Sequence, residues 1–178
     1  MNKCLRVLSA AAIALPCWLG FAPEFASAST GSFTFDDIHY WVGEGTNKAA
    51  IVIDWNNGRP GSSIAYGYRW NGTATNMAKI LRELDAEDRR LRVGISQGSW
   101  GSSMDDFGYD SNGDGGAFDF TGRMTTDPED FMSSSGATYY WSSAHITAPE
   151  VSGNDSWGYF GVGLDGQVPT NGQWIAYK

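Results

Sequence analysis

The stretch Ala49-Ala50-Ile51-Val52-Ile53-Asp54-Trp55 decides the fold that we expect for this chain. Its β-branched residues favour a strand, and the stretch ends at Asn56-Asn57-Gly58, a turn signal because Asn and Gly tolerate a positive φ. After this turn, the segment Ser63 to Trp70 alternates large apolar or aromatic residues with smaller or charged ones, as a strand does. The two segments together predict a β-hairpin.

The spacing of apolar residues changes after this hairpin. Met77, Ile80, Leu81 and Leu84 recur at three- and four-residue spacing, and Thr73 or Thr75 offers an N-cap. This pattern predicts one helix from about Ala74 to Arg90.

The rest of the chain favours short strands. Apolar segments divided by Gly, Ser, Asn and Pro predict strands at Phe33 to Val42, Leu91 to Gln97, Phe107 to Tyr109, Ala117 to Phe120, Ala137 to Ala144, Trp157 to Val162 and Gln173 to Tyr177. We therefore expect an α+β fold, a mostly antiparallel β-sheet with one packed α-helix.

The N-terminus has the three regions of a secretory signal peptide. Basic residues come first, an apolar run follows from Val7 to Phe21, and Ala26-Ser27-Ala28 forms a cleavage site. The apolar run is too short to span a bilayer, since about 20 residues are needed. We expect a signal peptide at residues 1–28 and a single secreted ligand-binding domain at residues 29–178, extracellular or at the cell surface, with the periplasm as an alternative.

Cleavage changes the composition of the mature domain. It removes both cysteines, Cys4 and Cys17, so no disulfide or thiolate chemistry is expected. It also removes Lys3, Arg6 and Glu24, which leaves 10 basic and 19 acidic residues. Such an acidic surface is a poor partner for nucleic acid or anionic membrane, and we expect no transmembrane segment in the mature form.

The mature sequence carries no catalytic motif that we recognise. It has no Gly-x-Ser-x-Gly, no His-Glu-x-x-His and no phosphate-binding glycine loop. His39 and His145 fall in separate aromatic segments, and adjacent acidic residues such as Asp105-Asp106 point to opposite faces of a strand. We therefore expect a binding protein and not an enzyme.

One acidic loop resembles a calcium site. The segment from Asp110 to Gly115 matches the first half of a calcium-binding loop, in which oxygens at alternate positions converge on the cation. Position twelve is Thr121 where such a loop has Glu. The candidate metal ligands for Ca²⁺ are Asp110, Asn112, Asp114 and Asp119. The alternative is an Asx-rich turn between two strands.

Seven tryptophans remain after cleavage, and most stand beside Gly or Tyr. Such rings can pack in the core, as we expect for Trp55, or offer a flat platform to a ligand. The candidate ligand contacts are Tyr66, Tyr68, Trp70, Trp100, Trp141 and Trp157. The sequence leaves open whether the Tyr66-Tyr68-Trp70 face points to the core or to a ligand.

Two motifs carry a resemblance to a family of secreted bacterial proteins of uncertain function. They are Trp41-Val42-Gly43-Glu44-Gly45-Thr46-Asn47, which leads into Ala49 to Trp55, and Tyr66-Gly67-Tyr68-Arg69-Trp70-Asn71-Gly72-Thr73. Similar proteins occur among surface proteins of gut bacteria, and some of these are associated with vitamin B12 capture. The resemblance extends from about Trp41 to Tyr177.

The order of segments is also similar to the C-terminal domain of transcobalamin and intrinsic factor. A hairpin and one helix are followed by strands with the aromatic group Tyr139-Tyr140-Trp141 and a closing Asp165-Gly166…Trp174 segment. The resemblance implies a β-grasp-like sheet that covers one face of cobalamin or another tetrapyrrole. It also implies a surface receptor or a second ligand-binding domain as partner.

Two other functions fit the same residues. In a carbohydrate-binding or adhesion module, the tryptophans would contact a surface glycan and the loop from Asp110 to Asp119 would bind Ca²⁺. In a structural cell-surface or matrix protein, the aromatic residues would serve packing alone.

Overall fold

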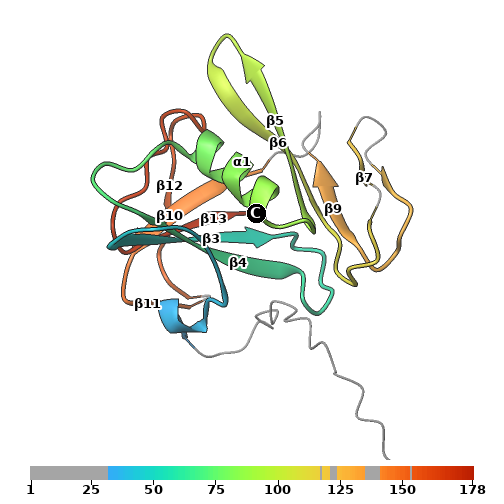
Figure 1. Cartoon of the computed structure of the whole chain (residues 1–178), viewed down its shortest axis with the longest axis horizontal. Helices are drawn as coiled ribbons and strands as arrows, with labels where there is room; N and C mark the ends of the chain where they lie inside the picture. Colours follow the sequence, from blue (N-terminus) through green and yellow to red (C-terminus); the bar gives the residue numbers. More distant parts are fainter. Residues whose placement is uncertain (1–31, 117, 121–123, 135–140, 153) are drawn as a thin grey trace, which may run out of the picture.

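The computed structural model describes residues 32–178 except 117, 121–123, 135–140 and 153 (Figure 1). The described chain has the predicted α+β fold, with one α-helix and mostly antiparallel strands. The predicted signal peptide lies outside the described residues. No helix in the described ranges is long and apolar enough to cross a membrane.

The central sheet has six strands in the order β12-β10-β13-β3-β4-β2. Their bounds are β2 Tyr40–Gly43, β3 Asn47–Asp54, β4 Ser63–Trp70, β10 Ser143–Thr147, β12 Gly158–Tyr159 and β13 Gln173–Tyr177. Strands β3 and β4 form the predicted antiparallel hairpin, while β3 and β13 run parallel, with Ile51 opposite Ile175. The hairpin, the helix that follows it and the parallel central pair together give the β-grasp-like arrangement.

Helix α1 (Met77–Glu87) is shorter than the predicted helix. It begins after Asn76, whose Oδ1 accepts a hydrogen bond from the Lys79 amide at 3.0 Å, so the predicted caps Thr73 and Thr75 are wrong. It ends at Glu87, because the next residue, the C-cap Asp88, has an extended backbone with φ −101° and ψ 108°. The spacing of the apolar residues correctly predicted a helix, and the N-cap Asn76 determines where it begins.

Strand β3 is buried on both faces, which divides the interior into two cores. Ala49, Ile51 and Ile53 belong to the first core, which lies between the sheet and α1. Ala50 and the half-buried Val52 belong to a second core on the other face. A strand buried on both faces has a continuous apolar sequence, and residues Ala49 to Ile53 form such a sequence.

A three-stranded sheet covers the first core beside α1. It consists of β5 (Leu91–Gly98), β6 (Gly101–Tyr109) and β9 (Phe131–Ser134), in the order β5-β6-β9. The β5–β6 hairpin extends past α1, at the top of Figure 1. A short ladder of β7 (Phe118–Asp119) and β8 (Met124–Thr125) lies near β9.

The second core is covered by the N-terminal segment, where the prediction of one strand from Phe33 to Val42 is wrong. The segment forms β1 (Phe33–Thr34), the 3₁₀ helix η1 (Phe35–Asp37) and then β2. Asp37 Oδ2 accepts hydrogen bonds from both the amide and the Oγ1 of Thr34 at 2.7 Å, and this capping box breaks the strand. Strand β1 pairs with β11 (Glu150–Val151) below the sheet (Figure 1).

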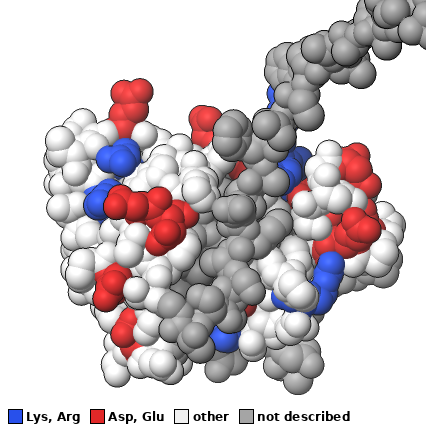
Figure 2. Space-filling view, turned by 90° about the horizontal axis from the view of Figure 1, so that it is seen from below, with Lys and Arg blue, Asp and Glu red and all other residues white. Residues whose placement is uncertain are grey.

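The described surface is mainly acidic. In Figure 2, which views the molecule from below, Asp and Glu side chains are spread over the visible described surface, while Lys and Arg side chains lie singly or in small groups. This distribution agrees with the net charge of −8 of the whole sequence.

Candidate functional site

The three aromatic residues proposed on β4 are part of the first core. Tyr66, Tyr68 and Trp70 expose 2%, 6% and 7% of their surface. The Oη of Tyr66 donates to Asp88 Oδ2 at 2.8 Å, and the Oη of Tyr68 donates to Glu83 Oε2 at 2.7 Å. The β4 aromatic face therefore points inward, because the apolar face of α1 packs over it, and the expectation of a ligand platform here is corrected.

Two further candidates, Trp141 and Trp157, are half-buried. Trp141 packs edge-on against Phe107, with ring centroids 4.7 Å apart, and against the core residue Trp55 at 6.5 Å. Trp157 packs against the second core. Both rings contribute to packing and leave only part of their surface to a ligand.

Trp100 is presented to solvent at the turn between β5 and β6, with 97% of its surface exposed. Beside it, the amide of Ser102 donates to Asp165 Oδ2 at 2.6 Å and its Oγ donates to Asp165 Oδ1 at 3.0 Å. These bonds, the backbone one first, lower the pKa of Asp165. Leu164 also donates its amide to Ser102 O at 3.0 Å. The turn that carries the indole is therefore anchored to the segment around Asp165.

The other exposed large apolar residues lie in that same segment. Across the described residues the set consists of Trp100, Tyr159 (77% exposed), Val162 (54%) and Val168 (44%). All four fall at the β5–β6 turn or between residues 159 and 168, and these two segments are hydrogen-bonded to each other. We call Trp100 and residues 162–165, which lie beside its turn, the Trp100 surface.

Sequence reasoning found Trp100 and missed Tyr159. The available signal was the adjacent pair Tyr159-Phe160. Phe160 packs against His145 with centroids 4.5 Å apart, and neighbouring residues of an extended segment point to opposite sides. Tyr159 therefore faces outward.

The acidic loop brings three of the four proposed calcium ligands together. The buried Asp110 accepts hydrogen bonds from the amides of Gly113, Gly115 and Gly116 at 2.6, 2.9 and 3.1 Å. Burial alone would raise the pKa of Asp110, but these bonds outweigh it and lower the pKa. The carboxylate of Asp110 thus closes the loop on itself, as in an Asx-rich turn.

Carboxylates that the sequence did not single out lie at the same loop. Asn112 Nδ2 lies 3.2 Å from Asp114 Oδ2, 3.1 Å from Asp127 Oδ2 and 3.4 Å from Glu129 Oε2. Asp119 stands in β7 with an exposed side chain. Within the described ranges, no three His, Cys, Asp or Glu side chains are arranged to hold a metal ion. Calcium binding by this loop stays a prediction.

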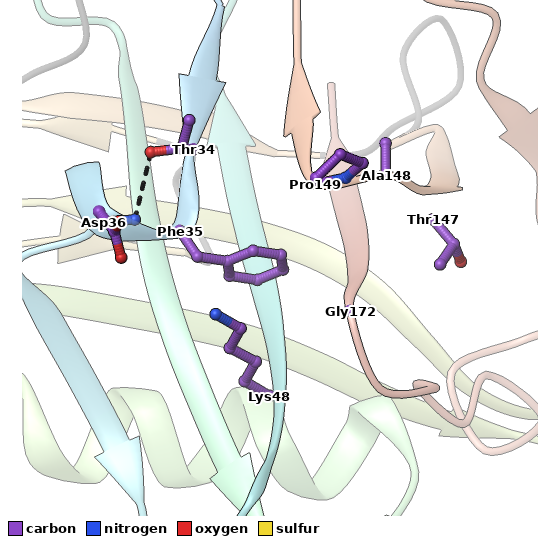
Figure 3. Close-up of a pocket in the computed structure, with 8 residues that line it drawn as sticks. All are labelled: Thr34, Phe35, Asp36, Lys48, Thr147, Ala148, Pro149 and Gly172. Carbon is purple, nitrogen blue, oxygen red and sulfur yellow. Dashed lines mark hydrogen bonds between the residues drawn. The ribbon is translucent and has the colours of Figure 1, made fainter.

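A separate cavity of 550 Å³ opens on the second-core face of the sheet (Figure 3). Its walls are residues 34–36, Lys48, residues 147–149 and Gly172. The ammonium of Lys48 lies 4.5 Å from the centroid of the Phe35 ring. Sequence reasoning missed this cavity because its walls come from four segments that only the folded chain brings together.

Comparisons with known proteins place the chain in no family. Neither the protein-family models, nor the curated proteins, nor the solved structures contain a match to it. The resemblances described from the sequence therefore remain expectations.

Proposed function

We propose that this protein is an extracytoplasmic ligand-binding protein that contacts its ligand through the Trp100 surface. The observation that carries this proposal is the indole of Trp100, which exposes 97% of its surface at a hairpin turn that hydrogen bonds tie to Leu164 and Asp165. An exposed indole offers a flat apolar face on which a ligand ring can stack. The predicted signal peptide supports a location outside the cytoplasm.

The shape of this surface favours a surface glycan as ligand. An indole that exposes 97% of its area stands out from the protein and does not line a cavity. Small molecules are usually held in concave sites that bury most of their surface, whereas an aromatic platform can stack on one ring of an extended polymer. A sugar ring has an apolar face that suits such stacking, so we favour a carbohydrate-binding or adhesion module.

A corrinoid or another tetrapyrrole is the second candidate. The β4-β3-β13-β10 order with α1 supports it, because the predicted resemblance to the transcobalamin C-terminal domain implied a sheet with these features. Fold alone does not establish function. Since Trp100 stands on an open surface, this candidate requires a receptor or a second domain to cover the other face of the macrocycle.

The decisive experiment is a binding screen with the wild-type protein and with Trp100→Ala. Insoluble cellulose, chitin and peptidoglycan are the glycan probes, and cyanocobalamin and haemin are the macrocycle probes. We expect binding to at least one glycan, weakened about tenfold by Trp100→Ala, because stacking on an aromatic ring contributes about 1–3 kcal/mol.

Two matched variants control this screen. Trp100→Tyr keeps an exposed aromatic ring and should retain part of the binding, whereas Ser96→Ala changes an exposed residue of β5 and should have no effect. A Trp100→Ala protein that binds as the wild type does would refute the proposal. Binding of cyanocobalamin or haemin alone, with no glycan retained, would favour the second candidate.

A separate thermal melt tests the calcium prediction. If the loop binds Ca²⁺, a chelator should lower the Tm of the wild-type protein, and Asp114→Ala should remove that difference. An unchanged melting curve with chelator would reject the prediction.

A further inference from the structure

We propose that the cavity formed by Phe35, Lys48 and residues 147–149 is a second binding site, for a small molecule with a carboxylate and an apolar body. It lies on the second-core face of the sheet, whereas the β5–β6 sheet that carries Trp100 covers the first core. The inference therefore goes beyond the proposed function and does not rest on it.

The floor and one wall of the cavity are fixed by the packing of the second core. The Phe35 ring lies 4.6 Å from the ring of the fully buried Trp174. Trp174 Nε1 donates to Ala148 O at 3.1 Å, which holds the segment 147–149 opposite Phe35 (Figure 3). The Thr34–Asp37 capping box holds η1, and with it Phe35. The apolar floor is therefore formed before any ligand arrives.

The strand that carries Lys48 is fixed in the same way. The Lys48 amide donates to Asn171 Oδ1 at 2.9 Å, and Lys48 O accepts from the Gly172 amide at 2.7 Å. Because Lys48 alternates with Ala49 along β3, its side chain lies on the same face as Ala50 and reaches over the Phe35 ring. In Figure 3 its ammonium points toward that ring.

The ammonium of Lys48 is the feature that selects the ligand. The ion pairs among described residues join Lys79 to Glu83, Arg90 to Asp88 and Lys178 to Asp54, and none involves Lys48. Asp36 also lines the cavity, but it forms no ion pair with Lys48. A half-buried cation whose described contact is an aromatic ring leaves its N–H donors for an anion.

The remaining walls define the rest of the ligand. Ala148, Pro149 and the Phe35 ring are apolar, whereas Thr34, Asp36 and Thr147 are the polar residues that line the cavity beside Lys48. A volume of 550 Å³ lies within the range of about 300–1,000 Å³ that is usual for small-molecule sites. A suitable ligand has a carboxylate that accepts a hydrogen bond from Lys48 and an aliphatic or aromatic body that lies over Phe35. Such a ligand matches both the cation and the apolar residues of the cavity.

The test compares two probes that share a phenyl-substituted four-carbon chain and differ in its polar end, 4-phenylbutyrate with a carboxylate and 4-phenylbutanol with a neutral hydroxyl. Both are titrated into ¹⁵N-labelled protein, and the indole N–H resonance of Trp174 reports on the cavity wall. We expect the acid to bind about tenfold more tightly than the alcohol, because a hydrogen bond between two charged groups is stronger than one to a neutral hydroxyl.

A pair of lysine variants locates the charge preference. Lys48→Met keeps an unbranched chain over Phe35 and should abolish the preference for the acid. Lys79→Met removes an exposed lysine of α1 and should leave the preference intact. Equal binding of the two probes, no binding of either at tens of millimolar, or an unchanged preference in Lys48→Met would each overturn the proposal. The wild-type comparison decides the matter even if Lys48→Met does not fold.

Discussion

Trp70 and Trp100 have similar sequence contexts and opposite environments. Trp70 precedes Asn71-Gly72 at the end of β4, and Trp100 precedes Gly101 at the end of a turn. Trp70 exposes 7% of its surface and lies under the helix, whereas Trp100 exposes 97%. Glycine beside an aromatic residue therefore does not indicate exposure.

The segments around each tryptophan explain the difference. Trp70 ends an eight-residue strand whose alternate residues Ile64, Tyr66 and Tyr68 are all buried, and the next element is a helix that must cover an apolar face. Trp100 follows Gly98-Ser99 in a tight hairpin that leads away from the core. The burial of each tryptophan therefore depends on which face of a strand it occupies and on whether the next element covers that face.

The largest effect that we expect comes from Trp70→Ala. Truncating a buried tryptophan removes its packing and leaves a cavity, which should lower the free energy of unfolding by about 3–5 kcal/mol. Urea denaturation followed by circular dichroism measures the change. A loss under about 1 kcal/mol would contradict the assignment of Trp70 to the core.

Gly67→Ala should have the next largest effect. A Cβ at Gly67 would fall on the indole ring of Trp41, which covers the opposite face of β4. That ring is held by the hydrogen bond from its Nε1 to Ile38 O at 2.8 Å, so overpacking should lower the free energy of unfolding by about 1–3 kcal/mol.

Gly161→Ala is the matched control for this substitution. No heavy atom lies within 4 Å of the Cβ that it would introduce. We expect its urea midpoint to equal that of the wild type. A Gly67→Ala protein with the same midpoint would show that the Trp41 ring moves aside without cost.

Tyr66→Phe tests the polar end of the buried β4 face. The substitution leaves the buried Asp88 carboxylate without its bond from Tyr66, so the free energy of unfolding should fall by about 1–2 kcal/mol. Tyr68→Phe is the milder comparison, because its partner Glu83 is partly exposed. An equal loss of unfolding free energy in the two variants would contradict the expectation that the buried hydrogen bond to Asp88 contributes more than the partly exposed one to Glu83.

The same tyrosine predicts a pH dependence. Burial, followed by the nearby Asp88 charge, raises the pKa of Tyr66 well above the ordinary value of 10.0. The folded state thus holds the proton after the unfolded state has lost it, so this stabilisation is complete below pH 10 and falls as the pH rises beyond that value. We expect a shallower loss of stability above pH 10 in Tyr66→Phe, measured by urea denaturation at several pH values.

Trp100→Ala should have the smallest effect on folding, a change in the free energy of unfolding within about 0.5 kcal/mol. Its effect should appear in fluorescence, because the most exposed indole is the one most accessible to acrylamide. Stern–Volmer quenching should therefore decrease in the variant. A clear loss of stability would mean that the ring packs against the protein.

The elements with a strong period could be predicted from the sequence. Met77 to Leu84 predicted the helix, the run from Ala49 to Trp55 predicted β3, and β13 lies where Gln173 to Tyr177 placed it. The break in the N-terminal segment was not predicted, because it depends on the side chain of Asp37, which accepts a hydrogen bond from the Thr34 amide.

The candidate sites were predicted less completely. Trp100 was predicted as an exposed residue, but the anchoring of its turn to Leu164 and Asp165 depends on a contact between distant parts of the chain. The cavity at Lys48 depends on segments separated by more than a hundred residues. The local sequence pattern does not show which distant segments come into contact. The sequence around Lys48 therefore does not indicate that this residue faces a cavity.

The parallel pairing of β3 with β13 has a consequence for how the chain folds. The strand that lies between β3 and β10 is formed by residues 173–177, close to the C-terminus. Without those residues, β3 can pair only with β4, and β10 and β12 have no strand that joins them to the rest of the sheet. Pairing strands so distant in sequence is slow, because the loop between them must close first. We therefore expect slow folding, with a rate limited by closure of the long loop that separates β3 from β13.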